Sequence, residues 1–156
     1  MKPNIGIADK DRQAVAEILN TLLSDEFVLY VKTRNFHWNV TGLQFNDLHK
    51  FFEAQYEELD DVVDEVAERA RALGARAFGT LAEFRENTRL KETAGAVPAA
   101  KEMIAELLGD HETIIRALRQ DIEKADKGGD VGTNDFLTGL LEKHENASWM
   151  LRSYLG

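Results

Sequence analysis

The shortage of helix breakers is the feature that most limits how this chain can fold. The 156 residues include only two prolines, Pro3 and Pro98. Apolar residues recur at helical spacing from residue 8 or 9 to about residue 38, and again from about residue 45 to 73. Alanine, leucine and glutamate, which favour helices, are frequent in the sequence. We therefore predict long helices and an all-α fold.

Glycines divide the first half of the chain. Gly42 is predicted to break the chain in the turn after the first helix, and Gly74 to cap the second helix at its C-terminal end. A long connection then runs from about residue 75 to 97, with a short helix predicted at residues 81–84. A connection of this length is too long for a tight hairpin, so we expect it to cross the bundle.

Two further helices are predicted in the second half. The third begins near Pro98, which suits a first helical turn, and ends before Gly128. The fourth begins near Thr133 or Asn134, both reasonable N-caps, and runs to the chain end. Four long helices with one long crossover between the second and third are typical of a ferritin-like four-helix bundle. We expect residues 1–156 to form one domain.

Charge and composition exclude several classes of protein. The formal net charge is −9, so the surface repels phosphate and favours cations over nucleic acid. Because the chain has no cysteine, neither disulfides nor thiolate ligands are available. Residues 1–12 hold no apolar stretch typical of a signal sequence, and no apolar run approaches the roughly 18 residues that span a membrane. We expect a cytoplasmic protein without a membrane partner.

The chain contains four histidines: His37, His49, His111 and His144. His37 lies at the end of the first predicted helix and His49 in the opening turns of the second. In an antiparallel helix pair these positions lie at similar heights, so the two imidazoles can share one region. His111 and His144 have no matched partner, and we interpret both as structural or surface residues.

The second predicted helix carries two pairs of possible metal ligands. His49 and Glu53 are spaced i,i+4, as are Asp64 and Glu68, which places each pair on one face of the helix. Imidazole and carboxylate suit iron or zinc. Each pair also has a plain alternative: a surface ion pair for His49 and Glu53, and a solvated helix face for Asp64 and Glu68. His37 in turn fits a packed histidine at a helix end.

Helix geometry relates the two pairs across two copies of the chain. His49 and Asp64 are 15 residues apart, or about 22 Å along one helix, so they cannot bind one ion within one chain. Both pairs nevertheless lie on roughly one stripe. If two copies of this helix pack antiparallel about a two-fold axis, one register places His49 opposite Glu68 and Glu53 opposite Asp64. The symmetry then makes two equivalent composite sites.

Three segments of the sequence together resemble a known family. They are His37-Trp38-Asn39-Val40-x-Gly42-x-x-Phe45-x-x-Leu48-His49, Asp64-x-x-x-Glu68-Arg69-Ala70 and His144-Glu145-x-x-x-Trp149-Met150-Leu151-Arg152. The combination is similar to the signature of the Dps mini-ferritins, the DNA-binding proteins from starved cells. The resemblance spans almost the entire chain, and its most specific part is the two-histidine segment with the downstream Asp and Glu.

The resemblance implies a four-helix subunit in a hollow shell of twelve. A ferroxidase site would lie between two-fold-related subunits, with His37, His49 and Glu53 from one chain and Asp64 and Glu68 from the other. The two histidines, Asp64 and Glu68 would be catalytic, whereas the position of Glu53 is often Asp in the family. Ferrous iron would be oxidised preferentially by hydrogen peroxide and stored as ferric mineral, with zinc or another divalent cation as a substitute.

Three further residues are candidates for supporting roles. Trp38 would intercept one-electron by-products, or simply pack at the subunit interface. Acidic residues near the start of the fourth helix line a three-fold ion pore in the family, which makes Asp130 and Asp135 candidates. The alternative for Asp135 is a favourable interaction with the helix N-terminus.

Two other functions compete with iron storage. Family members that bind DNA commonly use a Lys/Arg-rich terminal tail, and this sequence has no basic tail at either end. With a net charge of −9 we expect no DNA binding. The second alternative is a non-catalytic helical scaffold, or a cage that binds metal without turning it over.

Overall fold

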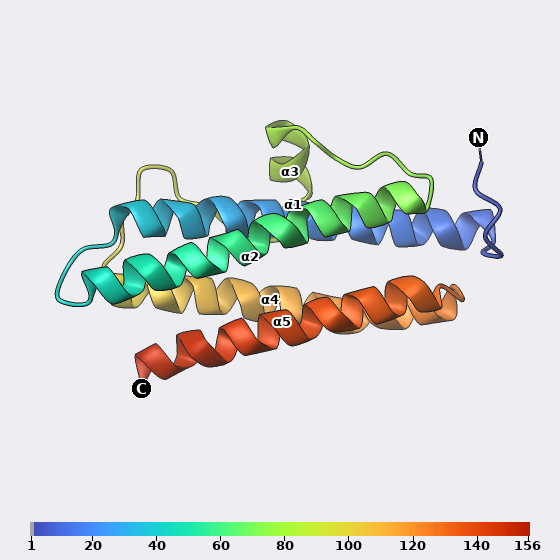
Figure 1. Cartoon of the computed structure of the whole chain (residues 1–156). Helices are drawn as coiled ribbons and strands as arrows, with labels where there is room; N and C mark the ends of the chain where they lie inside the picture. Colours follow the sequence, from blue (N-terminus) through green and yellow to red (C-terminus); the bar gives the residue numbers. More distant parts are fainter. Residues whose placement is uncertain (1) are drawn as a thin grey trace.

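The computed structural model describes residues 2–156, and in it the chain forms five helices. They are α1 (Asp9–Asn39), α2 (Phe45–Ala72), α3 (Leu81–Asn87), α4 (Ala100–Lys127) and α5 (Val131–Leu155). Helices α1 and α2 form one antiparallel hairpin, α4 and α5 form another, and the two hairpins pack against each other (Figure 1). The predicted all-α, four-helix bundle with a short extra helix is confirmed.

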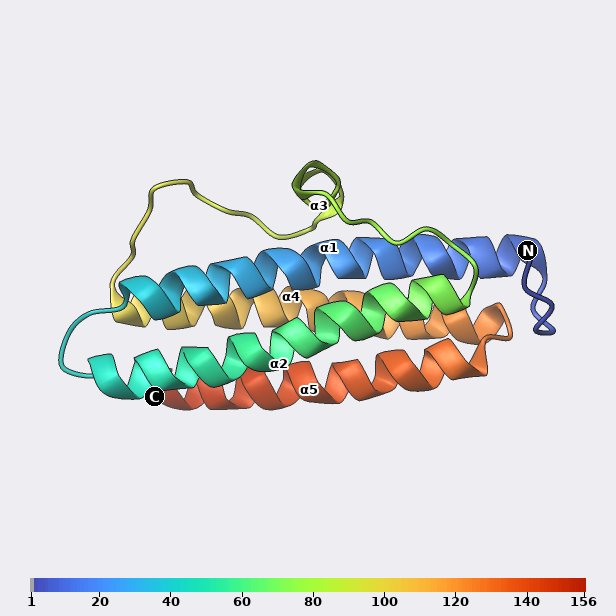
Figure 2. The same ribbon diagram turned by 45° about the horizontal axis from the view of Figure 1, so that its top comes forward.

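The connection between α2 and α4 runs along the length of the bundle, as predicted. It leaves α2 at one end, passes over α1 with α3 in its path, and reaches the start of α4 at the other end (Figure 2). Asn20 of α1 holds its first part, because the side-chain amide donates to the Arg76 carbonyl at 3.0 Å and accepts from the Phe78 N–H at 2.9 Å. The crossover is thereby fixed to α1.

A buried carboxylate holds the far end of the same crossover. Asp25 of α1 is fully buried and accepts from the backbone N–H and the Nε of Arg89, each at 2.6 Å. The Thr88 hydroxyl donates to it at 2.9 Å. Burial raises the pKa of Asp25, while the charge of Arg89 and these hydrogen bonds oppose the rise. These contacts fix the chain just after α3.

An apolar core runs the length of the bundle. Its fully buried side chains come from all four long helices and include Leu19, Leu22, Leu29, Leu48, Phe52, Leu107, Ile114, Leu118 and Leu137. Burial of each such side chain stabilises the fold by about 1.5–3 kcal/mol. The outward faces are more polar, and within residues 2–156 we find no helix with both the length and the apolar character needed to cross a membrane.

The turn between α1 and α2 is held between packed helix ends. Phe36 and Leu48, each adjacent to a predicted histidine ligand, are 2% and 0% exposed. The Phe36 ring lies 6.5 Å from that of Phe52. Gly42 has a φ of 108°, a conformation that other residues rarely adopt, so the predicted breaker is confirmed. The height at which the two histidines meet is thus set by the core and by this glycine.

The predicted start of the last helix is wrong by two or three residues. Helix α5 begins at Val131, and Asp130 is its N-cap, with the Asp130 carboxylate accepting from the Thr133 N–H at 2.9 Å. Thr133 and Asn134 therefore lie inside the helix. An acidic side chain three residues before a free N–H satisfies one of the unpaired donors of the first turn, and this sets the boundary.

The start of α4 is also displaced from its predicted position. Pro98 precedes the helix, which begins at Ala100. The carboxylate of Glu102 accepts from the Ala99 N–H at 2.9 Å and caps the helix from inside. Capping by Glu102 therefore places the boundary after the proline.

Candidate metal site

Two of the predicted ligands meet at one end of the bundle. The imidazoles of His37, at the end of α1, and His49, in α2, stack with their centroids 3.8 Å apart and their planes inclined by 18°. His37 is 6% exposed, while His49 is partly exposed. The prediction that the short turn brings them together is confirmed.

Backbone hydrogen bonds determine the tautomer of both rings. The Nδ1 of His37 lies 2.7 Å from the His49 carbonyl, and the Nδ1 of His49 lies 2.9 Å from the His37 carbonyl. Because a carbonyl oxygen only accepts, each Nδ1 must carry the proton. In the neutral rings each Nε2 then presents a free lone pair, and neither makes a hydrogen bond within residues 2–156. Such an arrangement is typical of oriented metal-binding histidines.

Aromatic side chains enclose the histidine pair. The Phe45 ring lies 5.1 Å from His49, and the Tyr56 ring meets His37 edge-on at 5.2 Å. The Tyr56 hydroxyl donates to Glu53 at 3.4 Å, which directs this carboxylate to the same end of α2. Burial, and next the Glu53 charge, raise the pKa of Tyr56. The neutral phenol can therefore position both His37 and Glu53.

The remaining predicted ligands do not join them within one chain. Asp64 and Glu68 lie exposed further along α2 and form no ion pair with other described side chains. Across the described part of the chain, no three His, Asp or Glu side chains are placed to hold one metal ion. A single subunit thus presents two separate half-sites, histidines at one end of α2 and carboxylates toward the other.

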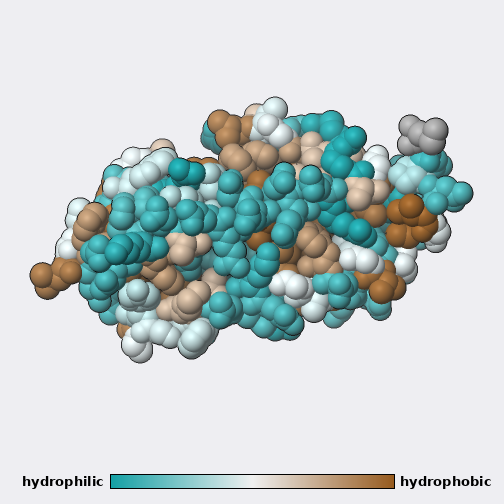
Figure 3. All heavy atoms as spheres, viewed as in Figure 1, coloured by the Kyte–Doolittle hydropathy of each residue, from teal (hydrophilic) through white to brown (hydrophobic). Residues whose placement is uncertain are grey.

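A groove lies beside the carboxylate half. It has a volume of about 560 Å³ and runs between α1, α2 and the crossover. Asp60, Asp61 and Asp64 line one side, and the aromatic rings of Phe27, Phe78 and Phe84 line the others. The face with α2 in front is largely hydrophilic, with hydrophobic atoms reaching the surface around α3 (Figure 3). Leu81 of α3 is 73% exposed, so this face offers apolar area next to unpaired carboxylates.

Trp38 and its neighbours lie next to the histidine half. The Trp38 side chain is 65% exposed. The Arg34 guanidinium lies 5.5 Å from the Trp38 ring and 4.5 Å from the Tyr56 ring. Such cation–π contacts fix the guanidinium against the aromatic faces. The exposed indole leaves open both roles expected for Trp38.

The two other histidines correct one part of the sequence interpretation. His111 and His144 do have a partner, each other: their Nδ1 atoms lie 2.8 Å apart, and both side chains are 3% exposed. They are structural core residues and not surface residues. The signal was available in the sequence: His111 follows Leu107 by four residues, and His144 follows Leu140 by four, so both lie on buried stripes.

The two candidate pore residues differ in their surroundings. Asp130 is 2% exposed, caps α5 and pairs with Arg69 of α2 at 3.0 Å. Its carboxylate is occupied within the subunit, and this does not support a role in binding pore ions. Asp135 is exposed in the first turns of α5, which is consistent both with a pore residue and with a favourable interaction with the helix N-terminus.

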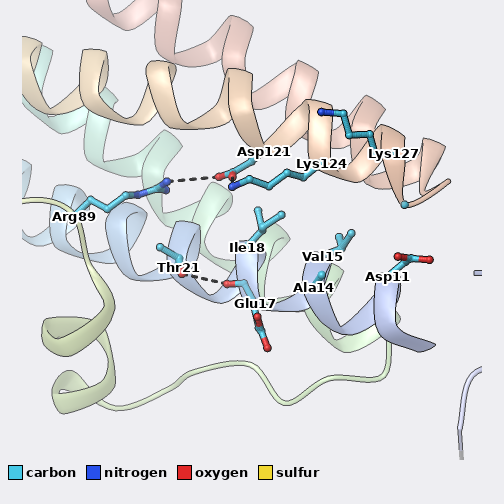
Figure 4. Close-up of a pocket in the computed structure, with 11 residues that line it drawn as sticks. Asp11, Ala14, Val15, Glu17, Ile18, Thr21, Arg89, Asp121, Lys124 and Lys127 are labelled. Carbon is cyan, nitrogen blue, oxygen red and sulfur yellow. Dashed lines mark hydrogen bonds and ion pairs between the residues drawn. The ribbon is translucent and has the colours of Figure 1, made fainter. Parts of the chain in front are cut away.

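A second groove, of about 500 Å³, lies between α1 and α4 and holds none of the five predicted ligands. Its buried carboxylate is already paired, because Asp121 binds Arg89 at 3.5 Å and Lys124 at 3.0 Å (Figure 4). We therefore place the candidate metal site at the two half-sites of α2.

Comparisons with known proteins agree with this architecture. The family model of the ferritin-like domain matches residues 16–156. An uncharacterized low temperature-induced protein of Nostoc sp. is 47% identical and covers 97% of this chain and 86% of its own length. The DNA protection during starvation protein 2 of Bacillus anthracis is 37% identical over 90% of this chain and 96% of its own.

Solved structures give the same result. The Dps protein of Bacillus brevis superposes with a TM-score of 0.91 at 35% identity, covering 96% of this chain and 100% of its own. A Dps protein of Vibrio cholerae, described as a member of a broad superfamily of ferritin-like diiron-carboxylate proteins, superposes with a TM-score of 0.94 at 30% identity, covering 99% and 97%. The chain belongs to the Dps family of ferritin-like proteins.

Proposed function

We propose that this chain is the subunit of an iron-storing ferroxidase cage whose catalytic site is completed by a second copy of the chain. The observation that carries the proposal is the division of ligands on α2. The free Nε2 atoms of His37 and His49 lie at one end, and the unpaired carboxylates of Asp64 and Glu68 lie toward the other. Neither half is a metal site alone.

A two-fold axis across α2 joins the halves. Antiparallel packing in the register that sets His49 opposite Glu68 also sets Glu53 opposite Asp64, so each dimer contains two equal sites. The apolar surface around Phe27, Phe84 and the exposed Leu81 offers area for such an interface. Membership of the Dps family supports a closed assembly, for which we propose twelve subunits.

The ligands suit iron as the substrate. Imidazole nitrogen and carboxylate oxygen bind ferrous iron, and the carboxylate charge favours the ferric product. Few protein ligands leave coordination positions open for the oxidant. Two ferrous ions each give one electron to one hydrogen peroxide, whose O–O bond breaks, and the ferric ions hydrolyse with release of protons. The product is ferric mineral inside the shell. Zinc or another divalent cation would occupy the same ligands without turnover.

The test is an anaerobic ferrous titration of the purified assembly, followed by peroxide addition and absorbance monitoring of ferric formation. We expect saturable binding and fast oxidation. In the His37→Ala/His49→Ala variant we expect binding and rate to fall by at least about a hundredfold, because loss of a residue that only orients a ligand already costs about 10–100-fold. Asn46→Ala, an exposed change one turn before His49, is the matched control and should leave both unchanged. If the double variant assembles normally and still oxidises iron at the wild-type rate, the protein does not use this site.

A further inference from the structure

The bundle core contains a buried relay of three titratable side chains. Glu26 of α1 lies 2.8 Å from the Nε2 of His144 in α5, and the Nδ1 of His144 lies 2.8 Å from the Nδ1 of His111 in α4. Their exposed fractions are 0%, 3% and 3%. None of the three belongs to the half-sites on α2. A chain of hydrogen bonds therefore crosses the core from α1 to α4.

A buried amide shares a cavity with the relay. Gln55 of α2 is 5% exposed, and neither its Oε1 nor its Nε2 has a hydrogen-bond partner within residues 2–156. The Nε2 of His111 is also buried and unpaired there. Gln55, His111 and His144 all line one cavity of about 20 Å³, the size of one water molecule. Unpaired polar atoms that share such a cavity are costly unless a proton donor or acceptor joins them.

When both histidines of the relay are neutral, their ring nitrogens can form one consistent set of hydrogen bonds. If the Glu26 carboxylate accepts from the Nε2–H of His144, the Nδ1 of neutral His144 accepts from the Nδ1–H of His111. The Nε2 of His111 then carries a lone pair and needs a donor. The Nε2–H of Gln55 can supply it, directly or through one water.

The same heavy atoms accept one more proton without losing a hydrogen bond. A proton that binds the Nε2 of His111 releases the proton on its Nδ1, which passes to the Nδ1 of His144. The positive charge then lies on His144, beside the Glu26 carboxylate, and His111 stays neutral. The Nε2–H of His111 now needs an acceptor, which the Oε1 of Gln55 supplies. The side-chain amide of Gln55 offers both a hydrogen-bond donor and an acceptor.

We propose that Glu26, His144, His111 and Gln55 form a proton-binding site in the bundle core, which takes up and releases one proton while the helices stay in place. Burial and the neighbouring His144 hold the pKa of His111 well below its ordinary value, in keeping with a ring that stays neutral in both forms. The site is separate from the proposed iron site and does not depend on it.

The surroundings give the proton a route and leave no place for a metal ion. Glu58, which is exposed, and Lys143, which is partly exposed, also line the cavity, so a proton has a short path between the surface and the His111 side. Asp110, the neighbour of His111 in α4, is paired with Lys32 of α1 at 2.7 Å, and Lys32 also binds Glu106 at 2.9 Å. A cation would need three converging ligands, and the described residues provide no such group. We therefore assign the site to a proton and a water.

Solid-state ¹⁵N NMR of the assembled, metal-free protein with labelled histidine tests the proposal between about pH 5 and 8. Single His37→Gln and His49→Gln variants identify the signals of those two rings. We expect His111 and His144 to change together with one midpoint: His111 exchanges its Nδ1–H form for its Nε2–H form, and His144 gains a second N–H. In Gln55→Leu both forms lose their Gln55 partner, but the midpoint should fall by about one pH unit, because an unpaired buried N–H in the protonated form costs more than an unpaired lone pair in the form with fewer protons.

Glu26→Gln should abolish the protonation of His144, whereas Glu145→Gln, the same change at the exposed neighbour of His144, should leave the joint transition intact. Gln55→Leu provides an independent test if Glu26→Gln does not fold. The proposal is overturned if the two rings titrate independently, if they keep one form throughout, or if Gln55→Leu behaves as the wild type. A shift of the His111 signal on addition of Zn²⁺ would likewise replace the proton site with a metal site.

Discussion

Arg69 of α2 and Asp130, the cap of α5, form a 3.0 Å ion pair between the two hairpins. The same guanidinium donates through its Nε to the hydroxyl of Thr133 at 2.9 Å. Arg69 follows Glu68 directly in α2, so this pair fixes the carboxylate end of the helix to the start of α5. Asp130 thus has two roles at once, as a helix cap and as a buried partner for a charge.

Replacement of Asp130 should therefore destabilise the subunit. We expect Asp130→Ala to lower the free energy of unfolding by at least about 1–2 kcal/mol, because it removes the N-cap and leaves Arg69 without its partner. Urea unfolding at fixed subunit concentration measures the change. Glu142→Ala is the control, since Glu142 is exposed within α5 and pairs with no described side chain, so its loss should cost no more than about 0.5 kcal/mol. Equal losses in the two variants would contradict the cap assignment.

Mixed assemblies test the shared site. An Asp64→Ala chain and a His49→Ala chain are each defective alone, but a heterodimer of the two recovers one complete site. Random mixing should restore about a quarter of the wild-type oxidation rate, since half the dimers are mixed and each has one good site. Mixing Asp64→Ala with Glu68→Ala must restore nothing, because both defects lie in the same half. Recovery in both mixtures, or in neither despite confirmed exchange, would argue against the two-fold site.

The stability of the subunit should fall as the solution becomes mildly acid. Because the pKa of buried His111 lies below its value in the unfolded chain, about 6.5, the unfolded state binds more protons below that pH. Folding therefore loses up to about 1.4 kcal/mol per pH unit from this group as pH falls below 6.5. In His111→Asn, which does not titrate, the urea midpoint should change less between about pH 7 and 5. An unchanged pH dependence would rule out His111 as its source.

DNA should not bind to the body of this protein. Each chain carries a formal charge of −9, and assembly multiplies the repulsion of phosphate. In a gel-shift experiment at low salt without divalent cations, we expect the protein not to retard the DNA. The same protein fused to a lysine-rich tail provides a positive control. If the unmodified protein retards DNA under these conditions, it has a DNA-binding surface that its net charge does not reveal.

Features determined by local spacing could be predicted from the sequence. The four long helices and the crossover follow from periodicity and breakers. His37 and His49 meet because the turn between them is short and Gly42 permits it. The separation of His49 and Asp64 follows from helix geometry alone. In each case the relevant distance is along the chain or around one helix.

Features that depend on contacts between distant segments were missed. The Glu26–His144 pair joins residues 118 positions apart, and His111 meets His144 across the α4–α5 hairpin. Their positions on buried stripes were visible, but the partner of each depends on how the helices rotate as they pack. The sequence suggests Asp130 as a pore residue, although Asp130 and Thr133 have the spacing of an N-cap.

The division of ligands between the two ends of α2 has a consequence for the timing of iron chemistry in the cell. Under the proposed arrangement a newly made or dissociated chain carries only incomplete centres and cannot oxidise iron. Oxidation begins once chains have paired, and paired chains are the building units of an enclosed shell. Under this arrangement no separate inhibitor is needed to stop ferric mineral from forming on free subunits, because the geometry of one helix delays the reaction until the shell assembles.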